Sequence, residues 1–125
     1  MPLYTIVTQA GTIDGSKRES LAVSITNLHV GMSGVPASWV HVVFLEYPSG
    51  SAFSAGRSAA MVSLTLIVRT GRSAEYKQAM LTALWRLLQE ATAAPDEQIV
   101  IGIQEVAPSQ AMEMGLVMPD VGTSS

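Results

Sequence analysis

The sequence repeats one pattern of strand, helix and strand, and this repeat constrains the fold more than any other feature. At an offset of 60 residues, the matches are Lys17 with Lys77, Leu21 with Leu81, and Leu28 with Leu88. At an offset of 59, they are Pro36 with Pro95, Val42 with Ile101, and Glu46 with Glu105. A one-residue insertion or deletion between the helix and the second strand would reconcile the two offsets. Similarity at a fixed period indicates a duplicated structural unit.

The first unit is expected to contain two strands around one helix. Residues 3–8 are β-branched and aromatic, which predicts a strand. Asp14 or Ser16 can cap the helix that follows. The buried face of that helix is indicated by the spacing of Leu21, Ile25, Leu28 and Met32. Residues 39–45 are continuously apolar and predict a strand buried on both faces.

The second unit follows the same plan, with strands at 62–68 and 98–104. Ser73 is the expected cap of its helix, and Pro95 ends that helix. The predicted buried stripe consists of Met80, Leu84, Leu87 and Ala91, widened by Leu81 and Leu88. Residues 48–60, which connect the units, predict a loop or a short irregular helix. An arm rich in methionine and proline begins at residue 107.

These elements predict an α/β (α+β) fold. Each strand–helix–strand unit requires a parallel strand pair with a right-handed crossover. Two fused units form a four-stranded sheet with both helices on one face. We expect a single domain over residues 1–122, with pseudo-repeats at about 2–48 and 62–108, a C-terminal arm at 109–122 and a tail at 123–125.

Composition indicates how the other face of the sheet is covered. The chain is 48% hydrophobic and only 14% charged, so we expect apolar surface to be buried between subunits. The prediction is a homo-oligomer, and a trimer is the favoured geometry.

The same composition excludes several classes of partner. A net charge of −3 with seven basic residues argues against nucleic acid. The chain has no cysteine, which removes disulfides, thiol chemistry and the usual structural-zinc ligands. No signal-like segment and no apolar run of 18 residues is present, so the prediction is a cytoplasmic protein without membrane contact.

Pro2 directly follows the initiator methionine. Removal of that methionine would leave a free proline, a secondary amine that can exchange protons near neutral pH if burial or nearby cations lower its pKa. If the methionine stays, the nitrogen is an amide and has no such role. The alternative is that Pro2 only begins an edge strand, where its missing N–H has no cost.

Two of the five arginines, Arg69 and Arg72, flank a glycine turn at the start of the second helix. Guanidinium groups bind carboxylates with two parallel hydrogen bonds, and a helix N-terminus adds N–H donors. We therefore expect a carboxylate site here, the alternative being two solvated surface groups. The equivalent junction of the first unit, residues 10–15, has no basic residue.

Three further side chains are candidates for function or packing. His29 lies at the edge of the buried stripe of the first helix, either as a packed core residue or as a donor to a bound anion or carbonyl. Glu113 lies between two methionines, where desolvation would raise its pKa and suit it to activating water, or it points outward. His41, within a strand, is interpreted as structural. No spacing of these residues suggests a metal site.

Together these residues resemble the tautomerase superfamily, specifically the branch containing cis-3-chloroacrylic acid dehalogenase. The resemblance spans residues up to 122. It is carried by the segments 2–4, 25–29, 69–74 and 105–115. It implies a homotrimer of fused β-α-β units and catalysis by an amino-terminal proline without a metal or other cofactor.

The resemblance also implies roles for individual residues. Pro2 would transfer protons, Arg69 and Arg72 would bind the substrate carboxylate, and His29 would assist at the carboxylate or carbonyl. Glu113 would activate water. The chain departs from the pattern at Gly102, where the dehalogenase has a tyrosine in its last strand. That change argues against efficient dehalogenation and favours a bulkier substrate.

The leading hypothesis is a cofactor-independent tautomerase acting on small enol or 2-oxo carboxylic acids such as arylenolpyruvates. Gly102 and the loop at 49–60 would admit the aryl group. Three alternatives stay open: a cis-3-haloacrylate dehalogenase or hydratase, a metal-free oxygenation of an enol, and a non-catalytic trimer that binds small anions. Whether Pro2 acts as an acid or a base is also open.

Overall fold

The computed structural model, which describes residues 1–121, contains the four-stranded sheet that the repeat predicts. The strands are β1 (Leu3–Gln9), β2 (His41–Tyr47), β5 (Val62–Arg69) and β6 (Ile99–Val106), in the order β2-β1-β5-β6. β1 pairs parallel with β2, and β5 pairs parallel with β6. The two units join through the antiparallel pair β1–β5, so β1 begins at the end of the sheet where β5 finishes.

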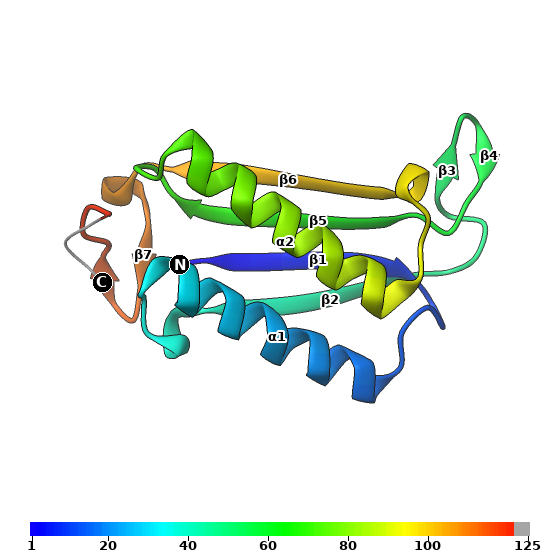
Figure 1. Ribbon diagram of the computed structural model, residues 1–125, viewed down its shortest axis with the longest axis horizontal. Coiled ribbons are helices and arrows are strands. Elements are labelled where there is room, and N and C mark those ends of the chain that lie inside the picture. The colour runs from blue at the N-terminus through cyan, green and yellow to red at the C-terminus, as the bar shows by residue number, and fades with distance from the viewer. Residues whose placement is uncertain (122–125) are drawn as a thin grey trace.

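Both helices cover the same face of the sheet, α1 (Gly15–Ser33) and α2 (Ala74–Thr92) (Figure 1). The side chains of Asp14 and Ser73 cap them by accepting hydrogen bonds from the backbone N–H groups of Lys17 and Tyr76. Of the two caps proposed for α1, the structure therefore selects Asp14. The predicted fold class is confirmed.

The core lies between the helices and the sheet. Its buried helical residues are Leu21, Ile25 and His29 of α1, and Met80, Leu84 and Leu88 of α2. The stripe predicted for α2 was shifted, because Leu87 and Ala91 are only partly buried and Leu88 lies at the centre. In α1, His29 lies in the middle of the buried face, and Leu28 is partly buried at the edge of the core.

The two units are related by a different register from the one the sequence suggested. The helix caps, both helices and the turns of 3-10 helix η1 (Ala37–Trp39) and η2 (Asp96–Gln98) all correspond at an offset of 59. The first strands correspond at 60, because Thr5 of β1 pairs with Thr65 of β5 at the centre of the antiparallel ladder. The register change therefore lies between first strand and helix, and the matches at 60 within the helices were wrong.

The connecting segments also differ from the predictions. Residues 39 and 40 precede β2, because η1 occupies this stretch. Within residues 48–60 the chain forms a hairpin of β3 (Phe53–Ser54) and β4 (Arg57–Ser58), neither a plain loop nor a helix. After η3 (Pro108–Gln110), the arm forms a second hairpin of β7 (Met112–Glu113) and β8 (Leu116–Val117). The hairpins lie at opposite ends of the sheet (Figure 1).

The helix-free face of the sheet is open in this single chain. Val43 and Leu45 of β2 and Val100 of β6 are 40%, 52% and 58% exposed. Gly102 lies on the same face, opposite Thr65 in the pairing of β5 with β6, and a Cβ atom added there would meet no atom within 4 Å. The strand 41–47 is therefore not buried on both faces within one chain. None of the helices in residues 1–121 is long and apolar enough to cross a membrane.

Candidate active site

A small pocket lies at the end of the sheet where β1 begins and β5 ends. It is lined by Met1, His29, Val35, Val68, Arg69, Arg72, Tyr76 and Val121. Its volume is about 20 Å³, which is room for about one water molecule. The pocket brings His29 and the two predicted arginines together with the N-terminal residue. Pro2, which lies between Met1 and the start of β1, is fully buried.

The amino terminus is held by a carboxylate. Oε2 of Glu113, a buried atom with no other hydrogen-bond partner within residues 1–121, forms an ion pair with the Met1 amino group. Burial, and to a lesser extent the charge of Arg69, lowers the pKa of that amino group to about 6. Glu113 is placed there by the tight β7–β8 turn, in which Met114 and Gly115 both have positive φ.

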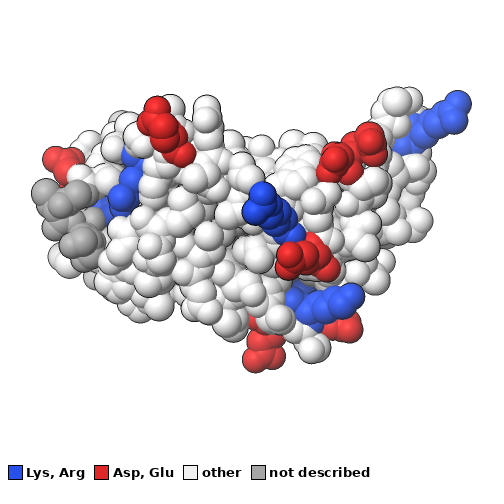
Figure 2. Space-filling view, in the orientation of Figure 1, with Lys and Arg blue, Asp and Glu red and all other residues white. Residues whose placement is uncertain are grey.

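The turn between β5 and α2 positions both arginines. Gly71 has a φ of 134°, a backbone conformation that residues with a side chain rarely adopt. A Cβ atom at this position would lie 3.0 Å from Val121. Arg69 is the last residue of β5 and is 4% exposed. Figure 2 shows that basic side chains at this end of the molecule are recessed among uncharged residues.

Each guanidinium rests on an aromatic ring. Arg69 lies 5.6 Å from the centroid of the Trp39 ring and donates a 2.7 Å hydrogen bond to the carbonyl of Pro119. Arg72 lies 4.9 Å from the centroid of the Tyr76 ring and donates to the carbonyl of Ser33 at 3.4 Å. Such cation–π contacts attract the guanidinium groups to these rings and help to hold them in place.

The pKa of Arg69 is shifted by burial and by neighbouring charged groups. Burial lowers the pKa of Arg69, Arg72 lowers it further, and Asp120 acts in the opposite direction. An arginine stays protonated despite such shifts. Both guanidinium groups therefore keep their positive charge at this end of the sheet.

His29 is an uncharged member of the site. It is 4% exposed, and its Nδ1 lies 2.6 Å from the hydroxyl of Tyr4. Burial lowers the pKa of His29 to about 4, with smaller contributions from Arg72 and the terminal ammonium. At neutral pH the imidazole is therefore neutral, with one nitrogen that donates and one that accepts.

Other residues singled out from the sequence lie elsewhere. His41 is exposed at the start of β2, where its backbone N–H donates to the carbonyl of Pro2. Gly102 lies on the open face, and the loop at 49–60 lies at the far end of the sheet, so neither lines the pocket of its own chain (Figure 1). The hypothesis that Gly102 and this loop admit an aryl group stays a prediction, and it would apply to the site of a neighbouring copy.

Sequence reasoning missed the aromatic supports Trp39 and Tyr76. Tyr76 lies four residues after Arg72, in the first turn of α2. This i, i+4 spacing could have indicated the contact between the two side chains. Trp39 gave no such signal, because residues 39–45 read as one uninterrupted strand.

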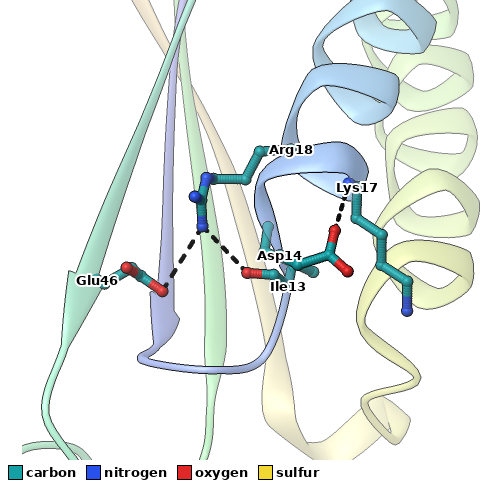
Figure 3. A network of polar contacts seen from close by, with 5 residues as sticks. All are labelled: Ile13, Asp14, Lys17, Arg18 and Glu46. Atoms are coloured by element: carbon teal, nitrogen blue, oxygen red, sulfur yellow. Dashed lines mark hydrogen bonds and ion pairs between the residues drawn. The ribbon is translucent and has the colours of Figure 1, made fainter.

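The corresponding junction of the first unit is closed by its own ion pair. Arg18 of α1 turns back to donate a 3.1 Å hydrogen bond to the carbonyl of Ile13, and it lies 3.9 Å from Glu46 (Figure 3). This guanidinium already faces a carboxylate of its own chain. The duplicated fold therefore has one end with clustered arginines and another at which the basic group is neutralised.

The fold and this site place the chain among the tautomerases. The family model described as "Putative oxalocrotonate tautomerase enzyme" matches residues 1–125, and the chain belongs to this family. The resemblance to the tautomerase superfamily is thereby confirmed. No curated protein matches the sequence.

Solved structures agree with this assignment. Native Ps01740 is 38% identical with a TM-score of 0.86, and the match covers 89% of this chain and 99% of that one. N1, a member of the cis-3-chloroacrylic acid dehalogenase (cis-CaaD) family, is 28% identical with a TM-score of 0.90, covering 97% and 86%. A wild-type fused 4-OT symmetric trimer, 20% identical with a TM-score of 0.83 over 92% and 94%, shares the fold.

The buried imidazole makes stability depend on pH. Between pH 6.5 and about 4 the unfolded chain binds a proton at His29 that the folded chain does not. The free energy of unfolding should therefore decrease as the pH falls through this window, by up to about 3 kcal/mol from this residue. Urea unfolding from pH 4 to 7 should show a weaker dependence in His29→Gln. The exposed His41→Gln variant should retain the wild-type slope, and an unchanged slope in His29→Gln would contradict the prediction.

Proposed function

We propose that the protein, after loss of Met1, is a proline-dependent tautomerase that acts on small enol or 2-oxo carboxylic acids such as arylenolpyruvates. One observation carries the proposal: the N-terminal residue, just before β1, shares a pocket with Arg69, Arg72 and His29. An amine beside two guanidinium groups combines a proton carrier with a carboxylate clamp. Loss of Met1 would also enlarge the pocket, because Met1 is part of its lining.

Pro2 is best suited to act first as a base. Burial and Arg69 lower the pKa of the Met1 amino group to about 6. The same causes would act on the nitrogen of Pro2, which belongs to a fully buried residue one position further into the sheet. An amine with such a pKa is largely unprotonated at neutral pH and accepts a proton readily.

The reaction is then a transfer of one proton. The Pro2 nitrogen removes the hydroxyl proton of a 2-hydroxy-2-enoate while the C2–O bond becomes a carbonyl. The electron pair of the C2–C3 double bond takes the proton from the proline ammonium at C3, which yields the 2-oxo acid and regenerates the amine. Arg69 and Arg72 would hold the carboxylate, and His29 would donate to the carboxylate or the forming carbonyl.

Replacing Pro2 tests this directly. Pro2→Ala should slow ketonisation of phenylenolpyruvate by about 100-fold or more, because general acid–base catalysis commonly contributes at least that factor. The rate is measured from the loss of enol absorbance, with the free terminus verified by intact mass. Pro48→Ala, an exposed proline after β2, is the matched control and should keep the wild-type rate. Undiminished turnover in Pro2→Ala would end the proposal.

The second candidate is hydration or hydrolytic dehalogenation of a cis-3-substituted acrylate. The position of Glu113 favours it, because its buried oxygen reaches the terminal amino group. A carboxylate beside the catalytic amine could remove a proton from an attacking water molecule.

Glu113→Gln separates the two candidates. If the protein is a tautomerase, this variant should ketonise phenylenolpyruvate within about threefold of the wild-type rate, since Gln keeps the shape without the base. Halide release from cis-3-chloroacrylate is measured alongside. The dehalogenase would be favoured instead if the wild-type protein released halide at a substantial rate and ketonised negligibly, and if Glu113→Gln lost the halide release.

We also infer that the working form is a homotrimer in which the open faces of the sheets meet. Exposed Val43, Leu45 and Val100 on that face support this inference, as does the trimeric state named for the fused 4-OT. In such an assembly Gly102 and the 49–60 hairpin would approach the site of a neighbouring copy, where the space at Gly102 would admit an aryl group.

Sedimentation equilibrium tests the assembly. The protein should sediment at about three times the chain mass of 13.2 kDa, and Val43→Asp should shift it toward the monomer because it buries a charge in the interface. Val23→Asp, on the exposed side of α1, should leave the trimer intact. A monomeric wild-type protein would contradict the inference.

A further inference from the structure

The buried contact between Tyr4 and His29 joins the core of the sheet to the pocket. The two rings meet edge to face, with centroids 5.6 Å apart and an interplanar angle of 88°. The hydroxyl of Tyr4 lies 2.6 Å from Nδ1 of His29 and 3.8 Å from the sulfur of Met80. Tyr4 itself does not line the pocket, whereas His29 does.

Comparison of the two halves shows that the fold does not need this polar pair. At the offset of 60 found for the first strands, Tyr4 corresponds to Leu64, and at the offset of 59 found for the helices, His29 corresponds to Leu88. Both leucines are buried in the same core. The polar pair therefore occurs only in the half whose helix reaches the clustered arginines.

The hydrogen bond between Tyr4 and His29 can have either group as its donor, and the two arrangements have different consequences. If Tyr4 donates to Nδ1, the hydroxyl uses its one proton in a strong hydrogen bond, and the proton of the neutral imidazole lies on Nε2. If Nδ1–H donates to Tyr4, the one acceptor that the described part of the chain offers to the hydroxyl proton is the sulfur of Met80, which is a weak acceptor. The first arrangement satisfies both buried groups better.

We propose that Tyr4 is a positioning residue, which donates to Nδ1 and so holds His29 as the Nε2–H tautomer with that N–H available to a bound carboxylate or carbonyl. His29 then adds a donor beside Arg69 and Arg72 without adding a third positive charge. This deepens the proposed function and depends on it for the identity of the ligand. The tautomer itself is a property of the protein without ligand.

The tautomer is measured by ¹⁵N NMR of the ring nitrogens of His29 at pH 7, in protein without Met1. The spectrum should show an unprotonated Nδ1 and a protonated Nε2, and Tyr4→Phe should move the Nδ1 signal by removing its hydrogen bond. A protonated Nδ1 in the wild-type protein would overturn the proposal. The measurement needs no turnover, so it decides the matter even if the tautomerase activity is absent.

Ligand affinity distinguishes positioning from general support of the structure. Tyr4→Phe should weaken binding of phenylpyruvate by roughly 3- to 10-fold, the loss expected for one hydrogen bond, and should raise KM more than it lowers kcat. In a His29→Gln background, where the amide supplies a donor without Nδ1, the same change should alter affinity less than about twofold.

Tyr47→Phe is the matched control, since its hydroxyl donates to the carbonyl of Met61 in another part of the fold. It should leave both affinity and the His29 spectrum unchanged. If Tyr4→Phe weakens binding equally in the wild-type and His29→Gln backgrounds, Tyr4 acts through the general structure and the proposal fails. A Tyr4→Leu/His29→Leu variant, which copies the second half of the core, should remain folded but lose affinity.

Discussion

The structure depends most on one electrostatic arrangement, the placement of Arg69 and Arg72 beside the amino-terminal end of β1. Two like charges held close together in a partly buried site repel one another and every other cation nearby. Burial is the main cause of the lowered pKa values of the terminal amino group and His29, and the arginine charges add to it, Arg69 at the amino group and Arg72 at the imidazole. In the proposed function, the same charges would attract the substrate carboxylate. Trp39 and Tyr76 keep the guanidinium groups in place without neutralising them.

Duplication of the β-α-β unit makes this arrangement possible. Because β1 and β5 run antiparallel, the first residues of β1 lie beside the last residues of β5. The equivalent junction of the first unit lies at the opposite end of the sheet, but there Arg18 faces Glu46. Two copies of one scaffold have therefore come to differ in charge while keeping the same caps, helices and turns. A site of this kind needs few changes, since the scaffold already aligns a strand start, a strand end and a helix N-terminus.

Much of the fold could be predicted from sequence because duplicated apolar periodicity and helix caps act locally. Ser73, Pro95 and the apolar stripe through Leu84 predicted the second helix, and the turn at Arg69 and Arg72 predicted a carboxylate site, which stays a prediction. The register between the halves was misjudged because leucines recur at both offsets, and only strand pairing distinguishes them. His29 was expected at the edge of the buried stripe of its helix, whereas tertiary packing puts it at the centre of that stripe, against Tyr4. Contacts such as Arg69 with Trp39 join residues far apart in the chain, and no local pattern reports them.

The central claim is that the Pro2 nitrogen is a free amine whose pKa is lowered by burial and by Arg69. The most direct measurement is a ¹⁵N NMR titration of that nitrogen in the purified protein. The proposal predicts a titration with a midpoint well below the ordinary α-amino value of about 8, and a higher midpoint in Arg69→Gln. A nitrogen that does not titrate, as expected for an amide, or one with an ordinary midpoint unaffected by Arg69→Gln, would contradict it.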